Sequence, residues 1–305
     1  MFHKILVPLD GTPAAEHALP WALAIAERTE ASITLAQVHN ILAPILVGTE
    51  MAGDLAVDQT LREHEREHLS DLAARLSADG TQAVSWEVLE GSTVEELRDF
   101  ANRSAIDLVV MATHARGPLA RLLLGSVADK LVRRVEKPTL LIRPANEEAP
   151  DLAWRPALTR IWVPLDGSAL AEEVLGAAEE LARLTGAPIT LLSIADGNSP
   201  ETAQLVEHPP ALPEYVDAAA GAQNARQYLE AIAGRLKGKV AGVQTRVVVN
   251  RPVVPAILEQ VTDPHSELVA LATHGRGGLA RVMFGSIADE LLRNASCPVL
   301  LYRPR

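Results

Sequence analysis

An internal repeat is the feature that most constrains how this chain can fold. Residues 5–12, Ile-Leu-Val-Pro-Leu-Asp-Gly-Thr, return 156 residues later as Ile-Trp-Val-Pro-Leu-Asp-Gly-Ser. Residues 112–117, Ala-Thr-His-Ala-Arg-Gly, return 160 residues later as Ala-Thr-His-Gly-Arg-Gly, and a Gly-Ser pair follows in each case, Gly125-Ser126 and Gly285-Ser286. Two matches in the same order, with nearly equal spacing, indicate that one module of about 150 residues has been duplicated.

The length of the chain agrees with a duplicated module. Its 305 residues suit two domains of ordinary size, each with its own core. Residues 144–156 are acidic and contain three prolines, a composition typical of linkers with few crossing contacts. We therefore expect a first domain over residues 1–144, a linker over 145–156 and a second domain over 157–305.

Each copy alternates short β-branched runs with longer segments of helical period, which is typical of βαβ units around a parallel sheet. The charged run 62–67 has partners four residues apart and is expected on a solvated helix face. The pattern predicts an α/β fold with five parallel strands and helices on both faces, and it leaves strand orders 2-1-3-4-5 and 3-2-1-4-5 open. In the first copy we expect strands near 4–9, 32–38, 83–89, 107–112 and 138–142, and helices starting near residues 12, 57, 93 and 126.

Composition argues against several classes of protein. The formal net charge of -11 and an aromatic content of 3% oppose binding to a phosphate backbone or stacking on bases. A single cysteine excludes an internal disulfide. Apolar stretches are interrupted before the roughly 20 residues of a membrane-spanning helix, and no secretory leader is expected. We expect a cytoplasmic protein with no nucleic-acid or membrane partner.

Two aspartates stand where parallel sheets bind ligands. Asp10 and Asp166 directly follow the first predicted strand of each copy, at the carboxyl edge where such sheets hold small molecules. A carboxylate there can accept hydrogen bonds from a ribose or from an adenine amino group. It can equally shape the turn or cap the next helix, since Asp-Gly and Asp-Gly-Ser are common turn and cap sequences. Both roles stay open.

The Gly-Ser pairs mark a second place for chemistry. Ser126 and Ser286 each precede an aspartate by three residues, which is capping-box spacing and predicts that the serines start helices. A helix start presents unpaired N–H groups and positive dipole charge, and a preceding glycine lets phosphate oxygens approach. Phosphate binding and plain capping both fit this pattern.

Arginines and histidines near these loops add further candidates. The arginines flank the loops and can pair with phosphates or with other surface groups: they are Arg116, Arg121, Arg276 and Arg281. His114 and His274 have no adjacent nucleophile with an orienting acid, so we interpret them as packed or backbone-bonded. The sequence contains no Walker lysine loop, metal-binding histidine pair or cysteine cluster. It predicts no catalytic residue set and no protein metal site.

These motifs resemble the universal stress protein family in its tandem form, over nearly the whole chain. In nucleotide-binding members, the loop after strand four reads Gly, two residues, Gly, nine residues, and then Gly with Ser or Thr. Gly275 and Gly285-Ser286 match that spacing in the second copy, whereas Ala272 replaces the first glycine. In the first copy Ala112 and Ala115 replace both early glycines. The second copy is therefore the better candidate site.

The resemblance implies two tandem Rossmann-like domains of the adenine nucleotide alpha hydrolase type, with strand order 3-2-1-4-5. It also implies bound ATP or a related adenine nucleotide, with or without Mg²⁺. The implied contact residues in the second copy are Pro164, Asp166, Ile194, Leu271, Ala272, His274, Gly275, Arg276, Gly285, Ser286 and Ile287. Those in the first copy are Pro8, Asp10, Val38, Met111, His114, Ala115, Gly125, Ser126 and Val127.

We therefore expect an adenine-nucleotide-binding stress-response protein that acts by nucleotide-dependent regulation or by partner binding. A nucleotide-free, chaperone-like interaction module is the alternative, and a slow ATP hydrolase is a third hypothesis. The last predicted strand of each copy, 138–142 and 298–302, is strongly apolar. We expect the two copies to cover these strands mutually as a pseudo-dimer within the chain, as the resemblance also implies. A homodimer and an unidentified protein partner are further expectations.

Overall fold

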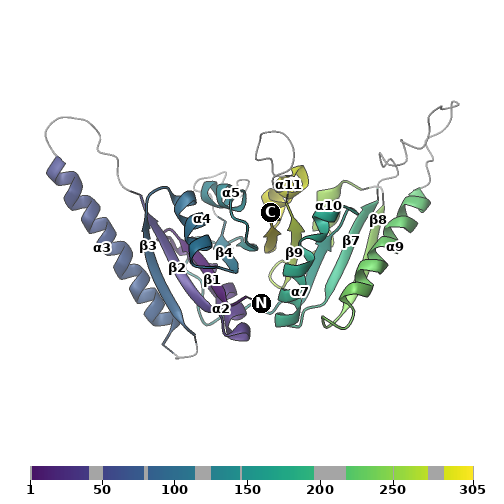
Figure 1. Ribbon diagram of the computed structural model, residues 1–305, viewed down its shortest axis with the longest axis horizontal. Coiled ribbons are helices and arrows are strands. Elements are labelled where there is room, and N and C mark those ends of the chain that lie inside the picture. The colour runs from purple at the N-terminus through teal and green to yellow at the C-terminus, as the bar shows by residue number, and fades with distance from the viewer. Residues whose placement is uncertain are drawn as a thin grey trace. The chain divides into compact units, whose positions relative to one another are not determined.

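The computed structural model describes residues 2–40, 51–78, 82–113, 125–144, 146–195, 218–249, 251–273 and 285–304. Its contacts divide the chain into two units, Met1–Pro156 and Ala157–Arg305. Each unit contains one copy of the repeat (Figure 1).

Unit 1 is an α/β domain around one parallel sheet. The strands lie in the order β3-β2-β1-β4-β5, which is the order 3-2-1-4-5 implied by the resemblance. They are β1 (Lys4–Leu9), β2 (Ser32–His39), β3 (Val84–Glu90), β4 (Leu108–Ala112) and β5 (Thr139–Ile142). The helices are α1 (Pro13–Glu16), α2 (Leu19–Thr29), α3 (Met51–Leu76), α4 (Thr93–Arg103) and α5 (Ser126–Val132).

Unit 2 repeats this arrangement. Its strands lie in the order β8-β7-β6-β9-β10, again 3-2-1-4-5 when numbered from the start of the copy. They are β6 (Arg160–Pro164), β7 (Ile189–Ala195), β8 (Val243–Val249), β9 (Glu267–Ala272) and β10 (Val299–Tyr302). The helices are α6 (Ala169–Glu172), α7 (Leu175–Thr185), α9 (Ala218–Leu236), α10 (Val253–Leu258) and α11 (Ser286–Asn294).

The central strands are almost entirely apolar because helices cover both faces of each sheet. Ile5, Leu6 and Val7 of β1 are fully buried, as are Ile161 and Val163 of β6. Right-handed crossovers place α1–α3 on one face of the unit 1 sheet, and α4 and α5 on the other. The carboxyl ends of β1, β2 and β4 therefore meet at one edge, between the two helical layers.

Three elements differ from the sequence-based prediction. The helix expected from residue 57 already includes Met51, six residues earlier, and residues 51–56 are mostly good helix formers. The helix expected from residue 12 is broken into α1 and α2. The run 62–67 is not wholly solvated: Arg62 and Glu65 have side chains only 27% and 20% exposed, since both face the sheet.

The segment expected as a linker contacts the rest of unit 1. The Trp154 ring meets the Trp21 ring of α2 edge-on, with ring centroids 6.4 Å apart. Arg155 Nε donates to Glu27 Oε1 at 2.6 Å, also on α2. Residues up to Pro156 accordingly belong to unit 1 in the contact division.

Among the helices in the described part of the chain, none is both long and apolar enough to cross a bilayer.

Candidate functional site

The aspartate after the first strand shapes its turn in both units. Asp166 Oδ1 accepts hydrogen bonds from Ser168 N at 2.9 Å and from Ser168 Oγ at 2.6 Å. Asp10 Oδ1 makes the same two bonds with Thr12, at 3.1 and 2.6 Å. The glycine between the two residues has a positive φ, +87° at Gly167, a conformation that side chains disfavour. The turn is therefore held by Asp and Gly together.

The helix that follows this turn is capped by the hydroxyl residue, not by the aspartate. Ser168 Oγ accepts from Ala171 N at 3.1 Å at the start of α6, and Thr12 Oγ1 accepts from Ala15 N at 3.3 Å at the start of α1. The aspartate precedes the cap by two residues and orients the capping hydroxyl through its hydrogen bond. The turn-shaping role left open by the sequence is thus present, and in unit 2 the aspartate also faces a cavity.

The second motif starts a helix, as expected, but with a different cap. Gly125 and Gly285 are the N-cap residues of α5 and α11, and neither helix has a side-chain hydrogen bond at its cap. Ser126 and Ser286 are therefore the first helical residues. The expected capping box is wrong because the glycine takes the cap position and shifts the aspartate one place further into the helix.

The displaced aspartates pair within their own helices. Asp129 contacts Arg133 at 2.7 Å, and Asp289 contacts Arg293 at 3.1 Å. Since no side chain of the described residues caps these helices, the first N–H groups of each helix can bind water or a ligand there. The N-terminus of α11 carries positive dipole charge at the carboxyl edge of the sheet, which suits an anionic group.

In unit 2 these features surround one cavity of about 270 Å³. This volume lies just below the roughly 300–1,000 Å³ of typical ligand pockets. Its polar side chains are those of Asp166, Ser168 and Ser286, and the other described residues of its wall are apolar. The cavity brings together eight of the residues that the resemblance implies: Pro164, Asp166, Ile194, Leu271, Ala272, Gly285, Ser286 and Ile287.

An alanine in place of glycine causes no backbone strain at the end of strand four. Ala272 is the last residue of β9, and Ala112 is the last residue of β4. Among the described residues, the non-glycine residues with positive φ are Glu30 and Ala105, so neither of these alanines is in the left-handed region. Their methyl groups matter only where a ligand approaches the chain closely.

The equivalent residues of unit 1 occupy the same positions in the fold. Pro8 is in β1, and Asp10 directly follows that strand. Val38 and Met111, near the ends of β2 and β4, are 7% and 5% exposed. Gly125 caps α5, which begins with Ser126 and Val127. These residues come from the carboxyl ends of β1, β2 and β4 and from the start of α5.

Several predicted residues fall outside the described part of the chain. These are His114, Ala115, Arg116 and Arg121 in the first copy, and His274, Gly275, Arg276 and Arg281 in the second.

Part of the cavity wall was not predicted from the sequence. Val253 and Ile257, one turn apart on α10, line it, as do Leu170 and Ala171 on α6. The apolar spacing of Val253 and Ile257 marks the buried face of a helix, but it does not show that this face borders a ligand cavity. Leu165, Ser168, Ala288 and Leu291 complete the wall.

Metal ligation by the protein finds no support in the described ranges. There, no three or more His, Cys, Asp or Glu side chains are grouped so that they could hold a metal ion.

Comparison with known proteins relates both copies to one family. Residues 1–143 and 158–303 each match the universal stress protein family. A universal stress protein of Mycolicibacterium smegmatis is 26% identical over 99% of this chain and 98% of its own length. One from Mycobacterium tuberculosis is 28% identical over 99% of this chain and 97% of its own length.

A solved structure has the same fold. The crystal structure of a universal stress protein from Archaeoglobus fulgidus covers 100% of both chains with a TM-score of 0.70 and 17% identity. At that identity, the likeness concerns the fold alone. Because the family match covers both copies and most of the chain, this protein belongs to the universal stress protein family.

Proposed function

We propose that the unit 2 cavity binds ATP or a related adenine nucleotide, and that the bound nucleotide regulates contacts with a partner in a stress response. The observation that carries this proposal is that Asp166 and the start of α11 line one largely apolar cavity. A nucleoside phosphate needs these three parts: a carboxylate for its sugar or base edge, an apolar slot for the base, and N–H groups for phosphate.

The slot for the base has apolar walls from both sides. Ile194 of β7 and Leu271 of β9 come from the sheet, and Val253 and Ile257 come from α10. Flat apolar contact of this kind holds an aromatic ring without specifying it. The base is then oriented by a few polar groups, and Asp166, two residues after β6, is one candidate.

At the phosphate end, the α11 N-terminus supplies positive potential. The described residues of the cavity wall include no lysine or arginine. Ser286 adds a hydroxyl, and Ile287, which is 41% exposed, forms the rim. Turnover is not part of the proposal.

The test is calorimetric titration of the whole chain with ATP and with adenosine, each with and without Mg²⁺. We expect ATP binding in wild type. Ile287→Asp should weaken ATP binding by tenfold or more, because it places a carboxylate beside the phosphates, and should leave adenosine binding little changed. The variant should fold, since acidic residues are favourable in the first turn of a helix.

Ile287→Asn is the matched control, because it has nearly the same shape without the charge. It should weaken ATP binding much less than Ile287→Asp does. A chain that binds neither ATP at millimolar concentration nor adenosine would instead support a nucleotide-free interaction module.

A further inference from the structure

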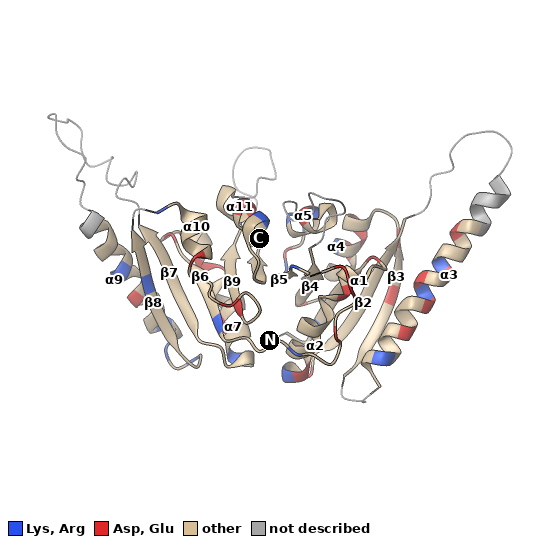
Figure 2. Cartoon of the chain, turned by 180° about the vertical axis from the view of Figure 1, so that it is seen from behind, with Lys and Arg blue, Asp and Glu red and all other residues tan. Residues whose placement is uncertain are grey.

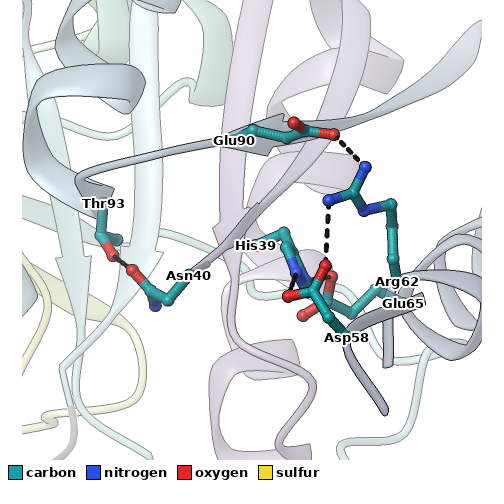
Figure 3. Close-up of polar contacts among 7 residues, drawn as sticks. All are labelled: His39, Asn40, Asp58, Arg62, Glu65, Glu90 and Thr93. Carbon is teal, nitrogen blue, oxygen red and sulfur yellow. Dashed lines mark hydrogen bonds and ion pairs between the residues drawn. The ribbon is translucent and has the colours of Figure 1, made fainter. Parts of the chain in front are cut away.

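An ionic cluster around the buried His39 connects α3 to the sheet of unit 1. His39, the last residue of β2, is 1% exposed. Its Nδ1 lies 2.8 Å from Glu65 Oε2 and its Nε2 lies 2.9 Å from Asp58 Oδ1, with both carboxylates on α3 (Figure 3). The imidazole thus connects two turns of the helix to the end of one strand.

The hydrogen bonds indicate which protonation state this geometry requires. Two carboxylate oxygens face the two ring nitrogens, and only the imidazolium ion can donate to both. Burial alone lowers the pKa of His39, but the hydrogen bonds and charges of Asp58 and Glu65 outweigh it and raise the pKa above the ordinary value. The bond to His39 is also the main reason that the pKa of Asp58 is lowered.

The other charged groups around His39 complete the cluster. Arg62 of α3 contacts Asp58 at 3.2 Å and Glu90 of β3 at 2.8 Å (Figure 3). With His39 protonated, two cations face the three carboxylates of Asp58, Glu65 and Glu90. Without that proton, Arg62 would be the remaining cation of the cluster beside the three carboxylates.

The same helix has a second contact further along. His68 of α3 lies 3.6 Å from Glu16 of α1, and Glu16 is 8% exposed. At the equivalent place in unit 2, the Tyr228 hydroxyl of α9 donates to Glu172 of α6 at 3.2 Å. This contact is therefore present in both units.

The His39 cluster, by contrast, is confined to unit 1. The helices α3 and α9 align at an offset of 160 residues, which matches Leu69 with Leu229, both fully buried. Figure 2 marks charged residues of both signs along α3. At the positions of His39, Asp58, Arg62, Glu65 and Glu90, unit 2 has Ala195, Ala218, Ala222, Ala225 and Val249.

We propose that protonated His39 locks residues 58–65 of α3 onto β2, so that unit 1 loosens as pH rises while unit 2 does not. A neutral imidazole keeps one N–H donor, and its other nitrogen turns a lone pair toward a carboxylate. One bond is then lost and replaced by repulsion, in an interior where unpaired polar groups are costly.

The direction with pH follows from the raised pKa. A group whose pKa is higher in the folded than in the open state adds stability that is complete below the open-state pKa, about 6.5 for histidine. This stability declines as pH rises through the folded-state pKa. Between the two values, the opening equilibrium of α3 should increase by up to tenfold per pH unit.

The experiment is amide hydrogen exchange of the whole chain from pH 6 to pH 9, read by mass spectrometry for peptides of α3 and of α9. Exchange chemistry itself accelerates with pH, so the ratio of α3 to α9 rates is the measured quantity. We expect this ratio to rise with pH in wild type. His39→Gln should give a higher ratio that no longer depends on pH.

His64→Gln is the matched control, since His64 is an exposed residue of the same helix and undergoes the same substitution. It should keep the wild-type dependence. Direct NMR titration of His39 should give a midpoint above about 6.5 and needs no variant to fold. A constant wild-type ratio, a His39→Gln chain that keeps the pH dependence, or a midpoint below that value would each overturn the proposal.

Discussion

Two equivalent carboxylates hold the start of the fourth strand in different ways. In unit 1, Asp107 Oδ2 accepts the backbone N–H groups of His3 and Lys4 at 2.9 and 3.1 Å. In unit 2, Glu267 Oε2 accepts the indole N–H of Trp162 at 2.9 Å. Trp162 is 1% and Glu267 is 5% exposed. Because the longer Glu267 side chain bonds a buried donor, its removal should lower stability more than removal of the Asp107 side chain.

We expect Glu267→Ala to destabilise unit 2 by about 2–3 kcal/mol, because it leaves the buried indole N–H of Trp162 without an acceptor. The exposed Thr262 also loses an acceptor for its N and Oγ1, which lie 3.1 and 2.8 Å from Glu267. Asp107→Ala should cost only about 1 kcal/mol in unit 1, since water can reach the exposed groups it leaves. Urea unfolding of each variant measures both values, and equal losses would contradict the prediction.

Two glycines of unit 2 should respond in opposite directions to the same substitution. A methyl group at either Gly167 or Gly176 would meet nothing within 4 Å, so neither alanine would clash. Gly167 has φ +87°, where alanine costs about 1–2 kcal/mol. Gly176 is in α7, where alanine gains about 0.5–1 kcal/mol. Thermal unfolding should therefore show a lower midpoint for Gly167→Ala and a higher one for Gly176→Ala; a shared sign would contradict this reasoning.

At the scale of elements, residues 146–156 pack against α2 of unit 1. Trp154 contacts Trp21 edge-on, and an aromatic pair of this kind stabilises a fold by about 0.5–1.5 kcal/mol. Trp154→Ala should therefore make this segment about two- to tenfold more sensitive to a protease of broad specificity. Trp154→Phe keeps an aromatic ring, so its sensitivity to the protease should lie between that of wild type and that of Trp154→Ala. Unchanged cleavage in Trp154→Ala would mean that the other contacts of the segment hold it alone.

The elements themselves could largely be predicted from the sequence. The parallel strands follow from short β-branched runs, such as Ile33–Val38, that alternate with helical segments. The chosen strand order needed the family resemblance, because both doubly wound orders satisfy the same pattern. The early start of α3 was missed because residues 51–56 carry no N-terminal signal that a pattern would detect.

The candidate site could be predicted only in part. Asp166 and Gly285-Ser286 were identified from local signals, a turn after a strand and a helix start. Val253 and Ile257 were missed because cavity walls depend on how distant elements meet, and local periodicity only says that such residues face inward. The His39 cluster was missed for the same reason: Asp58 and Glu65 are read as surface charges until the β2 terminus is placed beside them.

At the scale of the whole molecule, the two units share one fold but differ in the side chains at equivalent positions. Unit 1 concentrates charge between α3 and β2, where unit 2 has alanines. At the start of α4, Thr93 Oγ1 donates to Asn40 at 3.2 Å, whereas the corresponding Val253 of α10 lines the unit 2 cavity. Duplication has therefore preserved the sheet order, while the side chains at the carboxyl edges of the two sheets have diverged.

This divergence predicts unequal nucleotide sites. α11 has nine residues and α5 has seven, and the second copy keeps Gly275 where the first has Ala115. In calorimetric titrations of the whole chain with ATP, Gly285→Glu should remove most of the binding and Gly125→Glu little. Both glycines have negative φ, -57° and -52°, so the backbone tolerates a side chain and each variant should fold. The introduced carboxylate acts on the ligand, by occupying the phosphate position and repelling the phosphates. Equal losses in the two variants would mean that the copies bind alike, and that their divergence serves something other than the choice of site.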